Sequence, residues 1–315
     1  MLKSYIKDLR NGDVVLNQQF GLIFCAKKLG RMGNEYYEVI LGDKTGQIDA
    51  KIWANSFCNC DFPKCKEGDV VEITGKVDSF NEKPQLIIEK MTYVKDYDPA
   101  DFLYAGTMDK KKLWKYLMDE VNNLDDADIK NLILKIFSDE EFTKAYKNAV
   151  AGEMLHHDFI GGLLEHVYEM AKFAKVAKEL YSEVKYSELL FGVIFHDIGK
   201  LDELVAGGVA LKRTKSGFLL GHLVQGLLRV DKYFPSGFDE DKKLRIMHLI
   251  ASHHGVKEHG SPVVPMTLEA ILLNAIDDMS FKVGVMHSFA RSKIADDMGF
   301  LGYNKYLGAN LLSSE

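Results

Sequence analysis

The chain has 315 residues, with 40 Lys and Arg against 46 Asp and Glu, which gives a formal net charge of −6. Apolar residues make up 47% and charged residues 27%, an ordinary globular composition that excludes a wholly disordered or collagen-like chain. The acidic balance also argues against a protein that coats nucleic acid by bulk positive charge. The length predicts two domains.

The N-terminal residues contain no apolar core of the kind that a signal peptide carries. No run of about 18 apolar residues occurs, so we expect no membrane span and no membrane partner. Four cysteines are too few for a disulfide framework in a chain of this length. We therefore expect the protein to reside in the reducing cytoplasm.

Short strands separated by turns are predicted within residues 1–95. Apolar, aromatic or alternating runs occur at 18–26, 36–41, 47–53, 70–77 and 85–89. Five strands at this spacing predict a small antiparallel barrel. In the third run, Ile48 and Ile52 share one face, whereas Lys51 and Trp53 share the other. A polar, proline-containing linker follows over 96–110.

Helical periodicity dominates from residue 111 to about residue 290. Helices are predicted at about 109–122, 162–180, 186–198, 221–233, 240–254 and 267–285. Ser138 and Glu141 match a capping box, which predicts a further helix with Ser138 as its N-cap. Residues 291–315 match no pattern and are expected to form a C-terminal tail.

Histidine and aspartate residues recur along these helices at intervals that each fit one helix and its connection. They are His166, His196, Asp197, His222, His253, His254 and Asp277. Asp197 follows Leu190, Val193 and Ile194 on one apolar stripe. A buried carboxylate is costly unless it is paired or coordinates a metal. A single histidine of this kind is more often an ordinary core residue, and Asp197 alone would fit a helix cap, but the joint pattern favours a metal centre.

The ligand types suit Mn, Fe, Co, Ni or Zn rather than Ca. One ion is expected to bind the group His166, His196, Asp197 and Asp277. A second ion is expected to bind the group His222, His253 and His254, with Asp197 as the bridge. Two ions about 3.5–4 Å apart are typical of phosphoester hydrolysis. We expect Asp197 and Lys200 to be catalytic, with Lys200 on a phosphate oxygen or leaving group. The alternative for Lys200 is a solvated lysine at a helix end.

The pattern His166, His196-Asp197 and Asp277 resembles the HD superfamily of metal-dependent phosphohydrolases, whose helical core binds metal through H…HD…D. The segments 161–166, 195–200, 221–222, 252–255 and 260–270 resemble more closely the YhaM-type 3′→5′ exoribonucleases. That family joins an N-terminal OB-fold to an HD domain, and the resemblance covers about residues 12–290. It implies an α+β two-domain chain with an OB-fold β-barrel at 1–95, a linker at 96–110, an all-α HD domain at 111–290 and a tail at 291–315.

The resemblance also implies hydrolysis of single-stranded RNA from its 3′ end to nucleoside 5′-monophosphates. It implies two divalent ions with a preference for Mn²⁺, with Co²⁺, Fe²⁺, Ni²⁺ and Zn²⁺ as alternatives. Single-stranded DNA is an alternative substrate. Two other functions stay open: a phosphohydrolase that acts on mononucleotides, and a single-strand-binding protein with an inactive HD domain. A homo-oligomer is compatible with the sequence, which does not decide the oligomeric state.

An OB-fold binds single strands through aromatic rings and a positive groove. The residues expected to contact RNA are Trp53, Tyr36, Lys51, Lys27 and Lys28. The alternative is that both rings fill the barrel and that the two adjacent lysines are merely solvated. Cys58, Cys60 and Cys65 follow the spacing C-x-C-x4-C, whereas structural zinc normally takes four ligands in C-x2–4-C pairs. We therefore expect these three cysteines to be reduced thiols.

Overall fold

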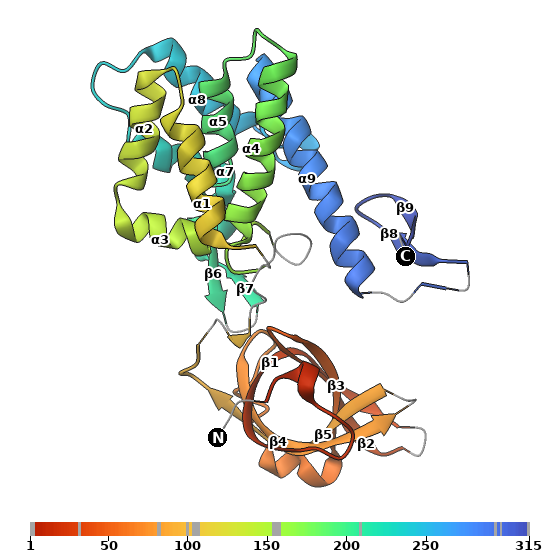
Figure 1. Ribbon diagram of the computed structural model, residues 1–315. Coiled ribbons are helices and arrows are strands. Elements are labelled where there is room, and N and C mark those ends of the chain that lie inside the picture. The colour runs from red at the N-terminus through yellow and green to blue at the C-terminus, as the bar shows by residue number, and fades with distance from the viewer. Residues whose placement is uncertain are drawn as a thin grey trace. The chain divides into compact units, whose positions relative to one another are not determined.

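The computed structural model describes residues 4–30, 33–80, 83–98, 101–102, 108–152, 159–207, 210–292, 295–296 and 298–313. The chain divides into two compact units (Figure 1). The first comprises Met1–Ala105 with Leu204–Arg213, and the second comprises Gly106–Glu203 with Thr214–Glu315. No helix of the described residues is long and apolar enough to cross a membrane.

The first unit contains a closed five-stranded barrel with the strand order β1-β2-β3-β5-β4 (Figure 1). Its strands are β1 (Val14–Leu29), β2 (Glu35–Asp43), β3 (Gly46–Trp53), β4 (Val70–Phe80) and β5 (Lys83–Val94). Each predicted run falls inside one of these strands. The prediction of an antiparallel barrel is wrong at one seam, because β3 and β5 pair in parallel with Ile52 opposite Ile88. A connection that includes the 3₁₀ helix Ala54–Asn59 separates β3 from β4.

The barrel core follows the alternation of the strands. Phe20, Leu22, Ile52 and Met91 are fully buried, whereas Trp53 next to Ile52 is 38% exposed. The predicted assignment of faces in β3 is therefore correct for Ile52 and Trp53. This places Trp53 on the outer surface of the barrel.

A hairpin of β6 (Leu204–Gly207) and β7 (Ala210–Arg213) groups with the barrel although it lies between helices in the sequence. Lys212 Nζ forms an ion pair of 3.1 Å with Asp69 Oδ1 of the same unit. The sequence did not predict this hairpin, whose strands are each only four residues long.

The second unit is helical (Figure 1). Its helices are α1 (Lys110–Asn122), α2 (Ala127–Phe137), α3 (Glu140–Asn148), α4 (Gly162–Leu180), α5 (Tyr186–Phe195), α6 (Lys200–Glu203), α7 (Lys215–Asp231), α8 (Glu240–Ser252) and α9 (Leu268–Ser292). The predicted capping box is wrong by one residue: Asp139 caps α3 by accepting from Phe142 N at 3.0 Å, whereas Ser138 ends α2. An aspartate is as good an N-cap as a serine, and here it stands one position closer to the helix.

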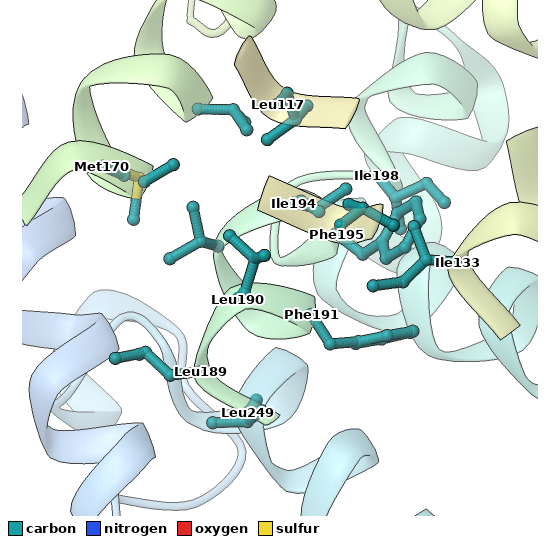
Figure 2. Packing of buried hydrophobic residues seen from close by; sticks show 14 of the residues in the cluster. Leu117, Ile133, Met170, Leu189, Leu190, Phe191, Ile194, Phe195, Ile198 and Leu249 are labelled. Carbon is teal, nitrogen blue, oxygen red and sulfur yellow. The ribbon is translucent and has the colours of Figure 1, made fainter. Parts of the chain in front are cut away.

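Helix α5 lies at the centre of the helical core, in contact with α2, α4, α8 and α9 (Figure 2). Leu189, Leu190, Phe191 and Phe195 are fully buried, so the helix has no solvated face. At Gly192 a Cβ would lie 3.0 Å from the Leu273 side chain, so the glycine allows α9 to approach closely. The close packing fixes the end of α5, where His196 and Asp197 follow.

Residues after the helical core differ from the expected tail. Helix α9 continues to Ser292, and a second hairpin follows with β8 (Phe300–Asn304) and β9 (Ala309–Leu312). The C-terminal segment therefore carries regular structure that the sequence alone did not reveal.

Candidate metal centre

All seven predicted metal ligands converge within the helical unit. They come from the first turns of α4 (His166), the end of α5 (His196), the turn before α6 (Asp197), the middle of α7 (His222), the end of α8 (His253 and His254) and the middle of α9 (Asp277). His166, His196, Asp197 and His253 are almost completely buried. Side chains from helices far apart in the sequence thus form one polar cluster inside an apolar core.

The first part of the cluster surrounds His196. Its Nε2 lies 3.3 Å from His166 Nε2, 3.3 Å from Asp197 Oδ2 and 3.9 Å from Asp277 Oδ1. His166 Nε2 lies 3.2 Å from the same oxygen of Asp277. Ligand-type atoms of His166, His196 and Asp197 all lie within 4.8 Å of one another, close enough for one cation to be shared among them.

The second part contains His222, His253 and His254, whose ligand-type atoms also lie within 4.8 Å of one another. His222 Nε2 and His254 Nε2 are 3.1 Å apart. Asp197 lies between the two parts: its Oδ1 is 3.5 Å from His222 Nε2 and 3.7 Å from His253 Nε2, while its Oδ2 faces His196. One carboxylate therefore presents an oxygen to each group.

The Nδ1 atoms of the five histidines all face away from the centre of the cluster. Three of them donate to backbone carbonyl oxygens: His196 to Val193 at 3.1 Å, His253 to Ile250 at 2.9 Å and His254 to His259 at 2.9 Å. A carbonyl oxygen only accepts, so these Nδ1 atoms carry a proton, and in the neutral ring the lone pair is on Nε2.

Side chains orient the other two imidazoles. His166 Nδ1 lies 3.0 Å from Ser280 Oγ, which itself donates to Glu169 Oε2 at 3.1 Å. His222 Nδ1 lies 3.0 Å from Glu203 Oε2. Metal-ligating histidines are commonly held by such acceptors on the other ring nitrogen.

Burial sets the charge of most of these histidines. It lowers the pKa of His166, His253 and His254, which favours their neutral forms. Burial also acts against a charge on His196, but the carboxylates of Asp197 and Asp277 together outweigh it and raise the pKa. Burial would raise the pKa of Asp197, yet the charges of Lys200 and His196 hold that pKa well below its usual range. Asp197 is therefore ionised.

The ring orientations bring acceptor-type atoms together. Burial favours the neutral form of His254, and its Nε2 lies 3.1 Å from His222 Nε2. Two further buried atoms, Asp197 Oδ1 and His253 Nε2, have no hydrogen-bond partner among the described residues. Buried acceptors without donors are costly. A cation among them removes that cost, so the residues present fit a divalent metal.

Two family models match this chain. The OB-fold nucleic acid binding domain matches residues 23–94, and the HD domain matches residues 163–281. The 3'-5' exoribonuclease YhaM of Oceanobacillus iheyensis is 31% identical over 262 residues, which cover 81% of this chain and 80% of that protein. The chain belongs to the YhaM family. The YhaM of Bacillus subtilis is 29% identical over 264 residues and covers 82% of both chains.

Among solved structures, the second OB-fold domain of replication protein A from Methanococcus maripaludis is 16% identical, with a TM-score of 0.24, and covers 30% of this chain and 98% of that one. The assignment to the YhaM family confirms the two-domain fold class, an N-terminal OB-fold barrel followed by an HD domain. The resemblance that the sequence motifs indicated is therefore confirmed.

The position of Lys200 excludes one of its two sequence expectations, the solvated lysine at a helix end. Its Nζ forms an ion pair of 2.6 Å with Asp197 Oδ2 and donates to Ala151 O. The side chain is only 14% exposed, so it is not a solvated lysine. The ammonium group lies beside the carboxylate at the centre of the YhaM-family cluster.

Sequence reasoning missed the residues that orient the histidines. Ser280 stands three residues after Asp277 on α9, so the helical spacing places both side chains on the same face. That spacing could have identified Ser280 as a neighbour of the cluster. No sequence pattern identifies Glu203, because its contact with His222 depends on how α7 packs against α6. His156 and His157, which lie upstream close enough to be considered for the cluster, fall outside the described residues.

On the barrel, Tyr36 of β2 pairs across from Trp53 of β3, with ring centroids 5.5 Å apart. Lys51 Nζ lies 5.5 Å from the Tyr36 ring centroid and 5.6 Å from that of Trp53. The structure thus brings three of the five expected RNA contacts together. Lys27 and Lys28 differ, since they form ion pairs with glutamates of the neighbouring strand: Lys27 with Glu35 at 2.8 Å and Lys28 with Glu38 at 3.8 Å.

The three cysteines of the C-x-C-x4-C segment are free thiols, as is Cys25. No group of metal-ligating side chains found among the described residues includes any of them. Burial raises the pKa of Cys60 and of Cys65 to about 11, so both are protonated thiols at neutral pH.

Proposed function

We propose that this protein is a metal-dependent 3′–5′ exoribonuclease that hydrolyses single-stranded RNA to nucleoside 5′-monophosphates. The observation that carries the proposal is the set of histidine Nε2 atoms that converge around the two oxygens of Asp197. Membership of the YhaM family supports the reaction class, because the relatives are named 3'-5' exoribonucleases. The OB-fold supports a nucleic-acid substrate.

The proposed metal ligands form two groups. His166, His196, Asp197 and Asp277 would hold one ion, and His222, His253, His254 and Asp197 would hold the other. Such ions, Mn²⁺ in our proposal, polarise a phosphodiester and lower the pKa of the attacking water. The borderline ligand set is also compatible with Co²⁺, Fe²⁺, Ni²⁺ or Zn²⁺.

The chain's own groups then prepare the site. Lys200 keeps Asp197 ionised and fixes the direction of its Oδ2 through the 2.6 Å ion pair. Its ammonium charge also lies where a phosphate oxygen would gain from a positive neighbour. Glu203 and the carbonyl of Val193 hold two imidazoles with their lone pairs inward. The helical core excludes water from the buried side of the cluster.

The barrel supplies the proposed grip on the strand. Tyr36 and Trp53 offer a tilted pair of rings for base stacking, and Lys51 places a positive charge beside both. Lys27 and Lys28 would add phosphate contacts only when a strand displaces their glutamate partners. We propose residues 1–95 as the RNA-binding domain, 96–110 as the linker, 111–290 as the hydrolytic domain and 291–315 as a C-terminal extension. We also propose that the protein is cytoplasmic and forms a homo-oligomer.

The test uses single-stranded RNA labelled at its 5′ end and incubated with Mn²⁺ or with EDTA. We expect a ladder that shortens from the 3′ end with Mn²⁺ and intact RNA with EDTA, because the reaction depends on the metal centre. Turnover of mononucleotides with intact RNA would instead support the phosphohydrolase alternative. Binding without turnover would support an inactive HD domain. A parallel reaction with labelled single-stranded DNA tests the second substrate.

Glu203→Gln is expected to raise the Mn²⁺ concentration for half-maximal activity by about 10- to 100-fold. Gln keeps the size of the side chain but removes the charge that holds His222 Nδ1–H at 3.0 Å. The rate at saturating Mn²⁺ should change less than the apparent metal affinity, which identifies a positioning role. Asp202→Asn is the matched control on α6, since Asp202 pairs with Arg229. Equal shifts in both variants would contradict the assignment.

Trp53→Ala is expected to weaken single-stranded RNA binding by about 5- to 150-fold, because one base–aromatic stack contributes about 1–3 kcal/mol. Affinity is measured in EDTA with a fluorescent oligonucleotide, so that hydrolysis does not interfere. Tyr93→Ala removes another exposed barrel ring, 43% accessible on β5, and is the control. An unchanged affinity in Trp53→Ala would remove this ring from the proposed RNA surface.

A further inference from the structure

A cavity of about 510 Å³ lies on the helical unit, lined by residues of α1, of α3 and of the end of α2. Four lysines line it: Lys110, Lys111, Lys144 and Lys147. Trp114 contributes an aromatic wall. None of these residues takes part in the metal centre or in the aromatic surface of the barrel. The cavity therefore has no role in the function proposed above.

Positive charge in this cavity is poorly neutralised. Lys110 Nζ donates to Asn148 Oδ1 at 2.9 Å, and Lys147 Nζ lies 4.0 Å above the Trp114 ring. Neither contact supplies a negative charge. Glu140 is the only acidic side chain among the described residues that line the cavity. Four ammonium groups face one carboxylate here, in a chain whose net charge is −6.

The lysines are also partly removed from water. Burial lowers the pKa of Lys110 and that of Lys147, because incomplete solvation destabilises both charged ammonium groups. An anion in the cavity would compensate positive charges for which the lining residues offer a single carboxylate.

The ring selects among anions. Trp114 packs edge-on against Phe137 with centroids 4.9 Å apart, and it is partly buried against the helical core. Its position is therefore fixed before any ligand binds. A ligand with both a phosphate and a flat base would use the lysines and the ring together. The cavity volume falls within the range of about 300–1,000 Å³ that is typical of small-ligand sites.

The cavity wall adjoins the first turn of α4. A Cβ on Gly161 would lie 2.6 Å from Lys110 Cε, and Gly161 N donates to Asn148 O at 3.3 Å. His166 lies on α4, five residues after Gly161. The cavity and the metal centre therefore belong to the same helical unit.

We propose that this cavity binds a nucleotide, with its phosphate on the lysines and its base against Trp114, at a site separate from the metal centre. A free nucleoside monophosphate and an internal nucleotide of RNA share this chemistry. The RNA form of the ligand rests on the proposed function, because the strand would then continue from the cleavage site. The mononucleotide form does not depend on that function.

Tryptophan fluorescence tests the proposal directly. The chain has two tryptophans, so Trp53→Phe leaves Trp114 as the only one. This protein is titrated in EDTA with uridine 5′-monophosphate, with hexauridylate and with inorganic phosphate. We expect saturable quenching by a nucleotide ligand. Lys111→Gln/Lys144→Gln in the same background should weaken binding at least about fivefold, because two cationic contacts are lost.

Lys112→Gln/Lys115→Gln is the matched control, since it removes the same charge from α1 at two lysines that do not line the cavity. It should change the affinity by less than about twofold. Tighter binding of hexauridylate than of the monophosphate identifies a strand segment, and similar binding identifies a mononucleotide site. Absence of quenching by both, or equal weakening in the two double variants, would overturn the proposal. Competition by inorganic phosphate as strong as that by the nucleotide would also overturn it.

Hydrolysis of RNA by the wild-type protein with Mn²⁺ is measured beside these titrations. Quenching by uridine 5′-monophosphate without hydrolysis would leave the nucleotide site standing and refute the exoribonuclease function. Hydrolysis without quenching would refute the nucleotide site alone. The two failures are therefore distinguishable.

Discussion

Asp197→Asn is expected to lower the rate of RNA hydrolysis by at least about 1,000-fold, since a metal centre supplies several kcal/mol and each 1.4 kcal/mol is a factor of ten. The amide has nearly the same shape as the carboxylate. It has only one oxygen and no charge, so it does not serve both groups of histidines that Asp197 now faces. Initial rates on a labelled single-stranded RNA at saturating Mn²⁺ measure the effect.

RNA binding in EDTA should change by less than about twofold in Asp197→Asn, because we place the strand on aromatic rings and lysines outside the cluster. Asp278→Asn is the matched control. It neutralises the residue next to Asp277, but this side chain is 50% exposed and pairs with Lys282. A melting curve in EDTA separates loss of fold from loss of function. Rates near those of wild type in Asp197→Asn would refute the metal-site assignment.

The cluster was predictable because metal-binding residue types occur at helical spacing on apolar faces. Polar residues on the apolar stripe of a helix are unusual, and Asp197 and Asp277 stand at such positions. The sequence also indicated that Asp197 serves both groups, and the structure places its two oxygens on opposite sides. The helix itself ends earlier than predicted, at Phe195, so Asp197 lies in a turn rather than on the helix.

Other elements were less accessible to pattern reasoning. Helix α2 has apolar residues at the spacing of Ile129, Leu132, Ile133 and Ile136, so its signal is present although the prediction omits it. The β6–β7 hairpin has strands too short for alternation to identify. Parallel pairing of β3 with β5 depends on how the chain crosses between distant strands, which local sequence does not encode. The ion pairs of Lys27 and Lys28 depend on strand register in the same way.

The contact between the turn after Asp197 and helix α7 is set by Gly199. A Cβ at Gly199 would lie 1.9 Å from His222 O and 2.6 Å from Gly226 N. Both are backbone atoms, so no side-chain rotation relieves the overlap. Gly199 does not have a positive φ, so the backbone conformation itself would tolerate an alanine. An alanine at position 199 is therefore unfavourable because its Cβ would overlap the backbone of α7.

Gly199→Ala is expected to destabilise the protein by about 3 kcal/mol, at the upper end for overpacking, and to lower its melting temperature by about 5–10 °C. It should also lower hydrolysis by about 100-fold or more, because moving α7 displaces His222 from Asp197, and a 1 Å misplacement has an effect of this size. Calorimetry in EDTA and RNA hydrolysis with Mn²⁺ measure the two effects.

Gly226→Ala is the control at the same contact, and its comparison with Gly199→Ala isolates the cause. There the nearest atoms to a Cβ are a methyl group of Ile198 at 3.3 Å and Gly199 N at 3.4 Å, so a small shift accommodates it. We expect a clearly smaller loss of stability and of activity than in Gly199→Ala. If the two variants were equally stable and equally active, the approach of α7 to this turn would not control the position of His222. The presence of glycine at position 199 would then need an explanation that does not involve the metal centre.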